Sequence, residues 1–191
     1  MLDIGCGFGD TTQRIAALVG VRGIAVGVDA ASRFIDTARR EAAEAGVENS
    51  HFEVADPQAK VPGGAGRTYH LAFSRFGTMF FAHPVVALRN VRRALLPGGR
   101  LAMVVWRRRI DNDWIYRAQT IVEQLVPKPE QYDEPTCGPG PFSMADADTT
   151  TDILRRAGYQ NIALHRCDEP ITIGFSPRRG DRFPDGTRPS R

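Results

Sequence analysis

The chain has 191 residues, 42% of them hydrophobic, which suits one domain with a sizeable core. Its formal net charge of +3 is too small to indicate nucleic-acid binding, because domains of that kind carry concentrated basic surfaces. No apolar run reaches the ~20 residues of a membrane span, and the first residues do not form a basic-then-apolar signal region.

The spacing of the cysteines bears on metal binding, disulfide formation and the redox compartment of the protein. Cys6, Cys137 and Cys167 lie far apart, without a C-x-x-C pair or a His-rich partner segment. This spacing predicts neither a metal site nor a disulfide framework. We therefore expect a reduced, cytoplasmic protein with a small-molecule substrate and no nucleic-acid or membrane partner.

Apolar blocks rich in β-branched residues alternate with longer stretches of helical period along most of the chain. This pattern predicts an α/β fold: a Rossmann-like, doubly wound, mostly parallel sheet with helices on both faces. The predicted strands are residues 1–4, 24–29, 51–55, 70–74, 101–106 and 161–167, and the predicted helices are residues 10–18, 32–45, 84–96, 114–126 and 148–157. Gly46, Pro97-Gly98-Gly99 and Gly158 follow helical patterns, where left-handed caps are expected.

Two segments interrupt this alternation. Residues 127–147 are rich in proline, which precludes a regular helix or a central strand, so we predict a loop or lid outside the sheet. Residues 176–191 carry five arginines and a single large apolar side chain, which predicts a disordered basic tail. The expected domain therefore covers residues 1–175.

A glycine-rich loop connects the first predicted strand to the first predicted helix. Gly5, Gly7 and Gly9 admit backbone angles closed to other residues and allow a ligand to approach the main chain. A phosphate is the usual ligand beside such a helix N-terminus. Here, however, Asp10 occupies the position where a dinucleotide fingerprint has its third glycine, and an acid there would repel a pyrophosphate.

Acidic residues follow the other predicted strands. Asp3 and Asp10 make the loop negative, which favours an ammonium or sulfonium ligand. Asp29 ends the second strand, where a carboxylate can accept both hydroxyls of a ribose, and Asp56 can accept from an exocyclic amine such as that of adenine. The alternatives are that Asp3 and Asp29 cap neighbouring helices and that Asp56 forms a turn before Pro57.

Four motifs in this order resemble the class I S-adenosylmethionine-dependent methyltransferases: "LDIGCGFG", "GVDA", "VADPQ" and "LLPGGRLAMVVW". Within that superfamily, "FSRFGTMFFAHPVVALRNVRRALLPGGRL" and "GPFSMADADTTTDILRRAGY" are similar to the small-molecule enzymes of the ubiquinone/menaquinone-biosynthesis type, the methyltransferase type 11 group. The resemblance covers residues 1–168 and implies that S-adenosylmethionine is the cofactor.

The resemblance also implies roles for individual residues. Asp3 would lie near the methionine amino group, Asp29 would bind the ribose and Asp56 would face the adenine amine. The implied cofactor-binding set is Asp3, Gly5, Cys6, Gly7, Gly9, Asp29, Ala30, Ala55, Asp56, Ser74 and Arg75. Cys6 is more simply a small buried residue than a nucleophile, because no basic residue adjoins it in sequence.

The sequence says less about the residues that would bind the methyl acceptor than about those that would bind the cofactor. Arg75 and His83 are the candidate catalytic residues, since either can orient or deprotonate an acceptor. Trp106, Trp114 and the proline-rich segment are candidates to enclose it. A cluster of Phe76, Phe80 and Phe81 is expected to pack in the core beneath the site.

The sequence departs from the family at both ends. Met1 falls inside the first motif, so the family's opening helix and the start of its first strand do not precede it. The family's final antiparallel strand is also expected to be missing, because Phe175 is followed by "SPRRGDRFPDGTRPSR". We therefore expect a shortened first strand and an open sheet edge in an incomplete domain.

The predicted function is transfer of a methyl group to oxygen or carbon of a small molecule. No N-P-P-[YF] motif, typical of enzymes that methylate planar amines, follows the fourth strand. One alternative is an NAD(P)-dependent oxidoreductase, against which Asp10 and the lack of a Tyr-x-x-x-Lys motif both count. Another is a truncated, non-catalytic remnant that binds only the nucleoside.

Overall fold

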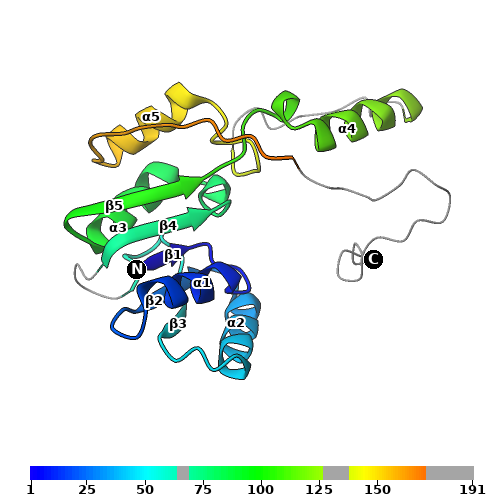
Figure 1. The fold of residues 1–191 in the computed structure, drawn as a ribbon. Coiled ribbons are helices and arrows are strands. Elements are labelled where there is room, and N and C mark those ends of the chain that lie inside the picture. Colours follow the sequence, from blue (N-terminus) through cyan, green and yellow to red (C-terminus); the bar gives the residue numbers. More distant parts are fainter. Residues whose placement is uncertain (64–68, 127–137, 171–191) are drawn as a thin grey trace.

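Five parallel strands form the centre of a computed structural model that describes residues 1–63, 69–126 and 138–170 (Figure 1). The strands are β1 (Leu2–Ile4), β2 (Ala25–Asp29), β3 (Ser50–Val54), β4 (Tyr69–Arg75) and β5 (Leu95–Val104). Their order in the sheet is β3-β2-β1-β4-β5, and all four neighbouring pairs are parallel. The predicted doubly wound α/β fold is confirmed. After β1 the chain adds β2 and β3 on one side, and it then crosses to the other side of β1 to add β4 and β5.

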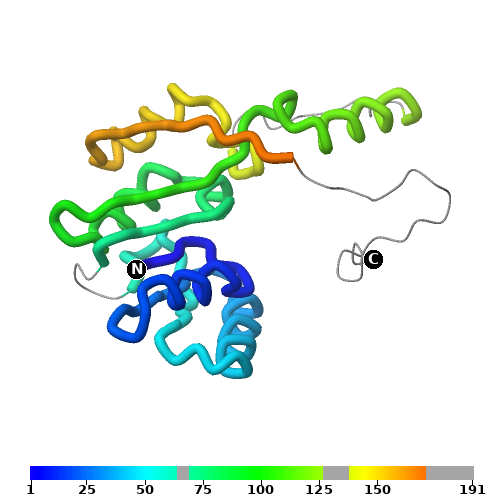
Figure 2. Tube along the Cα trace, viewed as in Figure 1, coloured from blue at the N-terminus to red at the C-terminus, as the bar shows by residue number. Residues whose placement is uncertain are grey.

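Helices cover both faces of this sheet. On one face lie α1 (Asp10–Val19) and α2 (Ser32–Glu44), and on the other lie α3 (Pro84–Ala94) and α5 (Ala147–Arg156). Ile15 of α1 packs against Ala25, and Val91 of α3 packs in a cluster with Leu2 and Ile4 of β1. The short helices η1 (Thr78–Phe80) and η2 (Arg109–Asp111) follow β4 and β5, and α4 (Asp113–Leu125) projects away from the sheet (Figure 2).

The central strand is short, as expected, yet it is fully buried. Leu2, Asp3 and Ile4 are 0%, 2% and 1% exposed, because β2 and β4 flank β1 and helices cover both of its faces. Burial of Leu2 and Ile4 contributes about 1.5–3 kcal/mol each. The glycine loop that leaves β1 is therefore anchored in a fully buried strand at the centre of the sheet.

The strand β5 begins earlier than the sequence predicts. Helix α3 ends at Ala94, and Leu95 already pairs with Tyr69 of β4, before a register shift that brings Arg100 opposite Leu71. Gly98 has a φ of 77°, so it allows this irregularity inside β5 rather than capping the preceding helix. Gly46 and Gly158, in contrast, adopt the predicted left-handed conformation directly after their helices, with φ of 66° and 94°.

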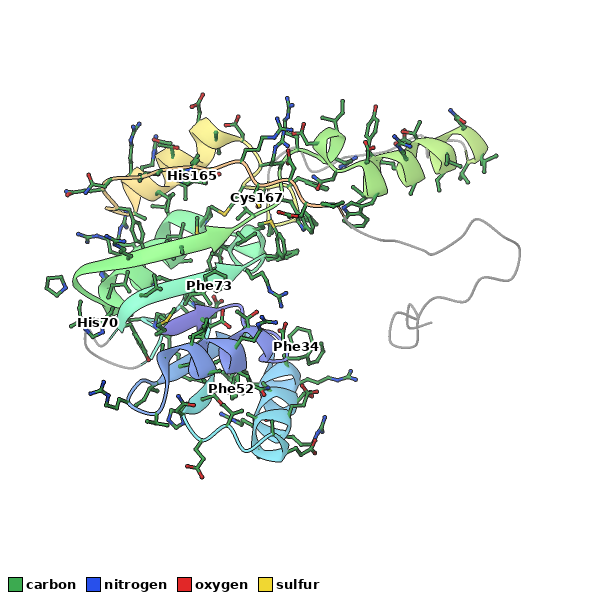
Figure 3. All side chains as sticks on the ribbon, viewed as in Figure 1. Phe34, Phe52, His70, Phe73, His165 and Cys167 are labelled. Atoms are coloured by element: carbon green, nitrogen blue, oxygen red, sulfur yellow. The ribbon has the colours of Figure 1, made fainter. Side chains whose placement is uncertain are left out.

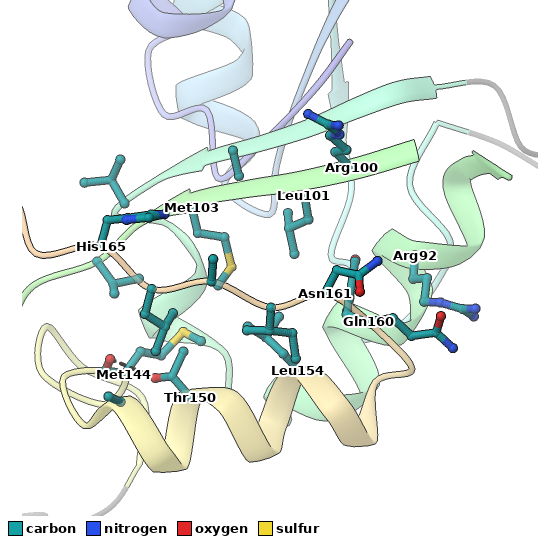
Figure 4. A pocket seen from close by; sticks show the side chains of 18 of the residues that line it. Arg92, Arg100, Leu101, Met103, Met144, Thr150, Leu154, Gln160, Asn161 and His165 are labelled. Carbon is teal, nitrogen blue, oxygen red and sulfur yellow. Dashed lines mark hydrogen bonds between the residues drawn. The ribbon is translucent and has the colours of Figure 1, made fainter. Parts of the chain in front are cut away.

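The strand predicted at residues 161–167 is wrong. The chain runs past β5 there, but within the described residues no backbone hydrogen bond joins this segment to the sheet. Asn161 has a left-handed φ of 54°, and the segment lines a cavity of about 1200 Å³ together with β5 and α5 (Figure 4). An alternating pattern can form a strand only where a partner edge lies within hydrogen-bonding distance.

Asn49 joins the end of α1 to the loop before β2. Its Nδ2 lies 2.9 Å from the carbonyl oxygens of Ala16 and Gly20 and 3.1 Å from that of Gly23. We expect Asn49→Ala to lower the free energy of unfolding by about 1–3 kcal/mol, because these carbonyls lose their donor. Urea unfolding measures this loss, and Asn49→Asp should show a similar one; no loss in either variant would contradict the prediction.

Several predictions concern residues beyond the described part of the chain. The domain end at residue 175, the basic tail at 176–191 and residues 127–137 of the proposed lid lie outside it, as does Cys137. In the part that is described, none of the helices has the length and apolar character needed to cross a membrane.

Candidate functional site

The glycine loop lies at the carboxyl edge of the sheet, between β1 and α1. Gly5, Gly7 and Gly9 all have positive φ, at 68°, 55° and 85°. The amide of Gly5 donates to the carbonyl oxygen of Val28 over 2.8 Å, and the amide of Gly7 donates to Oδ2 of Asp29 over 3.1 Å. The loop is therefore fixed to the end of β2.

Two features leave room for a ligand at this loop. A Cβ atom built on Gly7 would have no heavy atom within 4 Å, so this glycine faces open space. Helix α1 has Gly9 as its N-cap and no capping side chain, so amides of its first turn remain for another partner. Loop and helix together form a concave backbone surface at the switch point of the sheet, where open α/β sheets bind ligands.

Asp29 holds the loop and the start of α2 together. Its Oδ2 accepts from Gly7, and its Oδ1 accepts from the amide of Ala31 over 2.9 Å. Ala30, between them, is exposed. An ionised carboxylate has about four acceptor positions, so Asp29 keeps capacity for ribose hydroxyls after these two bonds.

Asp3 is buried directly beneath the loop. Its Oδ2 accepts a hydrogen bond of 2.7 Å from the hydroxyl of Thr12, and its side chain is 2% exposed. The pKa of Asp3 is raised to about 6, chiefly by burial. The nearby charges of Asp10 and Asp29 also raise this pKa, while the Thr12 hydrogen bond and the charge of Arg75 lower it. Three carboxylates therefore share one neighbourhood, as the strand-end pattern predicted.

Arg75, at the end of β4, forms an ion pair with Asp10, at the start of α1. Nη2 of Arg75 lies 2.6 Å from Oδ2 of Asp10, and the two side chains are 48% and 63% exposed. Such an exposed pair contributes at most about 1 kcal/mol to stability. Its main effect is positional, because it holds the guanidinium beside the loop.

Ser74 and Gly77 attach the end of β4 to the loop. The buried Ser74 hydroxyl donates to the carbonyl oxygen of Ile4 over 2.8 Å. A Cβ on Gly5 would lie 2.8 Å from Cα of Gly77, so these backbones meet where side chains cannot fit. The structure thus gives Ser74 a supporting position under the loop, and its contact with a cofactor stays a prediction.

Asp56 follows β3 and forms the turn considered as its alternative role. Its Oδ1 accepts from the main-chain amide of Gln58 over 2.9 Å and from the Gln58 side chain over 3.2 Å. Oε1 of Gln58 in turn accepts from the amide of His83, which precedes α3. Ala55 is 2% exposed and packs in the core. A role for Asp56 towards adenine, and one for His83 in catalysis, stay predictions.

Cys6 is a small core residue, as its sequence context indicated. It is 5% exposed and packs with Ile35 and Ala38 of α2. Burial raises the pKa of the Cys6 thiol to about 12, and the charges of Asp3 and Asp29 add to the effect. A thiol in this state is not a nucleophile near neutral pH.

Sequence reasoning missed several residues beside the loop. Thr12, in the first turn of α1, is the buried partner of Asp3, and the sequence pattern gave no signal for it. Phe8 and Phe34 form a tilted ring pair with centroids 4.7 Å apart, and Figure 3 labels Phe34 at the start of α2. Their side chains are 51% and 37% exposed although the two rings contact each other. A hydrophobic pattern alone does not reveal such an exposed pair.

The cavity beside β5 is separate from this loop. Its lining comes mainly from β5, α5 and residues 158–167, and includes Leu101, Met103 and Leu154 but no carboxylate (Figure 4). Among the described residues, no group of His, Cys, Asp and Glu could hold a metal ion. The glycine loop is therefore the stronger candidate site, because it combines open backbone with convergent charged groups.

The chain is similar to known proteins in sequence and in fold. Residues 1–99, just over half of the chain, match the family described as methyltransferase domain. The chain is similar to aklanonic acid methyltransferase DauC of Streptomyces sp. (strain C5), with 37% identity over 102 residues. The aligned region is 53% of this chain and 46% of that protein, so the chain spans about half the length of the curated relative that it matches.

Solved structures agree on the fold. A SAM dependent methyltransferase from Aquifex aeolicus aligns with a TM-score of 0.59 and 20% identity, over 82% of this chain and 70% of that one. The YcgJ protein of Bacillus subtilis aligns with a TM-score of 0.55 and 21% identity, over 82% of this chain and 59% of that one. The chain therefore belongs to the methyltransferase domain family, and its fold is that of the class I S-adenosylmethionine-dependent methyltransferases.

Proposed function

We propose that the chain binds S-adenosylmethionine at the glycine loop and directs its methyl group to oxygen or carbon of a small-molecule acceptor. The observation that supports this most is that three carboxylates, Asp3, Asp29 and the Arg75-paired Asp10, surround the open backbone of Gly7 and leave it a net negative charge. This negative field suits a ligand with an ammonium and a sulfonium group. A pyrophosphate would be repelled there, which counts against a nicotinamide cofactor.

The groups present at the loop are of the kinds that S-adenosylmethionine needs, namely carboxylate acceptors and open backbone. Asp29 would accept hydrogen bonds from the ribose hydroxyls with its remaining lone pairs. The open space beside Gly7 would allow the ligand to contact the main chain of the loop. Asp3, which accepts the Thr12 hydrogen bond beneath the loop, would balance the ammonium charge with its ionised carboxylate. Asp56 would accept a hydrogen bond from the adenine amine only with the carboxylate lone pairs that its bonds to Gln58 do not use.

When bound, S-adenosylmethionine supplies a methyl group on a positively charged sulfur, which an acceptor atom attacks from the opposite side. The chain's own task is to align the acceptor and to exclude water, since effective alignment alone can supply about 7–11 kcal/mol of rate enhancement. Arg75 lies beside the loop, where it pairs with Asp10. It would orient an acceptor that carries a negative charge.

The name of the matched relative supports an organic acid as the acceptor. That relative is an aklanonic acid methyltransferase. An ionised carboxylate needs no base before it attacks, because it carries no proton at neutral pH. An acceptor that needs no base suits this site, because the candidate base, His83, is exposed and contacts the turn after β3 through its main chain.

Calorimetric titration with S-adenosylhomocysteine, the demethylated product, tests the proposal. We expect one binding site for this ligand and no heat with NADH. Asp29→Ala should weaken binding by at least about tenfold, because a charge-assisted hydrogen bond contributes about 1.5–3 kcal/mol. Asp36→Ala, which removes a carboxylate 72% exposed on α2, should leave the affinity unchanged.

Two results would contradict this proposal. Binding of NADH in preference to S-adenosylhomocysteine would favour the oxidoreductase alternative. An unchanged affinity in Asp29→Ala, with its melting temperature retained, would place the nucleoside elsewhere.

A further inference from the structure

The turn after β3 is the next element along the carboxyl edge of the sheet beyond the glycine loop and Asp29. The loop follows β1, Asp29 ends β2, and the amide of Ala55, just after β3, donates to the carbonyl oxygen of Asp29 over 2.9 Å. Neighbouring strands lie about 4.8 Å apart. A nucleoside with its tail at Gly7 and its ribose at Asp29 would therefore extend its base to residues 56–60, which we call the β3 turn.

The described main chain that follows Asp56 in this turn has no N–H group left for a ligand. Pro57 carries no amide hydrogen. The amide of Gln58 donates to Oδ1 of Asp56 over 2.9 Å. The amides of Ala59 and Lys60 donate to the carbonyl oxygen of Asp56 over 3.0 Å and 3.1 Å. A donor to a ligand from the residues after Asp56 must therefore be a side chain.

Gln58 supplies that side-chain donor. Lys60, the other residue of the β3 turn with a side-chain donor, pairs with Glu53 over 2.9 Å. Nε2 of Gln58 lies 3.2 Å from Oδ1 and 3.4 Å from Oδ2 of Asp56. These two oxygens belong to one carboxylate and lie on the same side of Nε2, so one of its two N–H groups serves both. Among the described residues Nε2 has no other acceptor, so its second N–H is available to a ligand.

The orientation of the Gln58 carboxamide is fixed from α3. Its Oε1 accepts from the amide of His83 over 2.8 Å, so the oxygen faces the start of α3 and the nitrogen faces Asp56. Phe81, two residues before His83, packs against the core and holds this segment, whereas Phe80, expected in the core as well, is 55% exposed. The carboxamide therefore presents its second N–H in one direction.

The β3 turn is also anchored from beneath. Pro57 is buried, and its carbonyl oxygen accepts from Nδ2 of Asn90 on α3 over 2.8 Å. Asn90 is 7% exposed, and its Oδ1 accepts from Arg93 over 3.3 Å. Such a bond between buried groups is costly to break, because each group would be left without a partner. Asp56 and Gln58, on either side of Pro57, are therefore held as a preformed acceptor and donor.

We propose that Gln58 recognises the base of the cofactor together with Asp56, and that the two residues select adenine over a 6-oxopurine. Adenine donates from its C6 amine and accepts at the neighbouring N1, the ring nitrogen that lies farther from the ribose than N7. Asp56 would accept from the amine, and Nε2 of Gln58 would donate to N1. This inference rests on the proposed function, because it assigns the base contacts of the same cofactor site.

Hypoxanthine, the 6-oxopurine of the same shape, would be opposed by both residues. It has an oxygen where adenine has its amine, and its N1 carries a hydrogen. The carboxylate of Asp56 would then face an oxygen, and the N–H of Gln58 would face another N–H. A site built to hydrogen-bond one ligand rejects a mismatched analogue, because its polar groups are left unpaired.

Two ligand analogues test these contacts separately by calorimetry. S-inosylhomocysteine replaces the amine by an oxygen, and the 1-deaza analogue of S-adenosylhomocysteine replaces N1 by C–H and keeps the amine. We expect the unsubstituted chain to bind S-adenosylhomocysteine about 10- to 100-fold more tightly than S-inosylhomocysteine. It should also bind S-adenosylhomocysteine about 3- to 10-fold more tightly than the 1-deaza analogue.

Gln58→Glu and Gln58→Leu identify the donor to N1. Glutamate keeps an oxygen for the His83 amide but lacks the N–H, and leucine removes the carboxamide without adding a charge beside Asp56. Both variants should bind S-adenosylhomocysteine about 3- to 10-fold more weakly and should no longer favour it over the 1-deaza analogue. Gln124→Glu, the same change at an exposed position of α4, should retain both preferences.

The pattern across the ligands separates this inference from a purely structural role of Gln58. If Gln58 only supports the turn, its variants will weaken both ligands equally and keep their ratio, which would overturn the inference. Equal binding of S-adenosylhomocysteine and the 1-deaza analogue by the unsubstituted chain would overturn it too, while the proposed function would stand. No binding of S-adenosylhomocysteine to the unsubstituted chain would overturn the proposed function, and this inference with it.

Discussion

Gly5→Ala is expected to lower the melting temperature by about 6–15 °C and to abolish measurable binding of S-adenosylhomocysteine. The added Cβ would lie 2.8 Å from Cα of Gly77, a backbone atom that no side-chain rotation can move away. The φ of 68° adds strain of about 1 kcal/mol for alanine, and the collision adds about 1–3 kcal/mol more. The ends of β1 and β4 must then separate, which displaces the loop and Arg75 together.

Two other glycines serve as matched controls for this variant. Gly46→Ala imposes a similar φ of 66° with no atom within 4 Å of the new Cβ, so it should cost only the strain and leave ligand binding unchanged. Gly7→Ala also meets no protein atom, but its methyl group enters the space assigned to the ligand. It should therefore keep most of the stability and lose affinity. Equal melting temperatures for Gly5→Ala and Gly46→Ala would show that the backbones do not meet as described.

The sequence predicts the sheet well where its pattern reflects burial on both faces. Residues 24–29 were expected as a strand, and β2 spans Ala25–Asp29 because β1 and β3 pair with it on either side. The same kind of pattern at residues 161–167 produced no strand. A periodicity reports which side chains share a face, whereas a strand also needs a neighbouring edge, and that is a property of the whole fold.

The candidate site was predictable to a similar degree. Carboxyl ends of parallel strands meet at one edge, so Asp3 and Asp29 could be expected near each other from their positions alone. The hydrogen bonds and ion pairs that set the charge of this site come from residues elsewhere in the chain. Thr12 reaches Asp3 from α1, and Arg75 pairs with Asp10 from 65 positions away. Such long-range contacts leave no local signal in the residues that make them.

The buried state of Asp3 makes ligand binding dependent on pH. Its pKa is raised to about 6 by burial, so the free protein holds this carboxyl protonated at pH 5 and ionised at pH 7.5. The ammonium of S-adenosylhomocysteine favours the ionised form, and a proton must leave before the pair can form. We expect the affinity to rise by up to about tenfold per pH unit below pH 6 and to level off above it.

Stability should change in the opposite direction. The pKa of Asp3 is higher in the folded chain than the ordinary value of 3.8 for an exposed aspartate, so the protonated carboxyl is the form that folding favours. Its contribution is complete below about pH 4 and is lost as the pH rises through about 6, at a cost on the order of 2–3 kcal/mol. The ligand-free protein should therefore be destabilised by Asp3 in the range where it binds best.

Asp3→Asn separates these two effects in one protein. Asparagine keeps an oxygen that can accept the 2.7 Å hydrogen bond from Thr12, so the fold should tolerate it. Between pH 5 and pH 7.5 the variant should lose both pH dependences, melt higher than the unsubstituted chain at pH 7.5 and bind S-adenosylhomocysteine at least about tenfold more weakly there. Calorimetric titrations and thermal melts at pH 5, 6 and 7.5 measure both quantities. If the pH dependence of binding persists in Asp3→Asn, another group must balance the ligand's charge, and the role of the buried carboxylate beneath the glycine loop would be refuted.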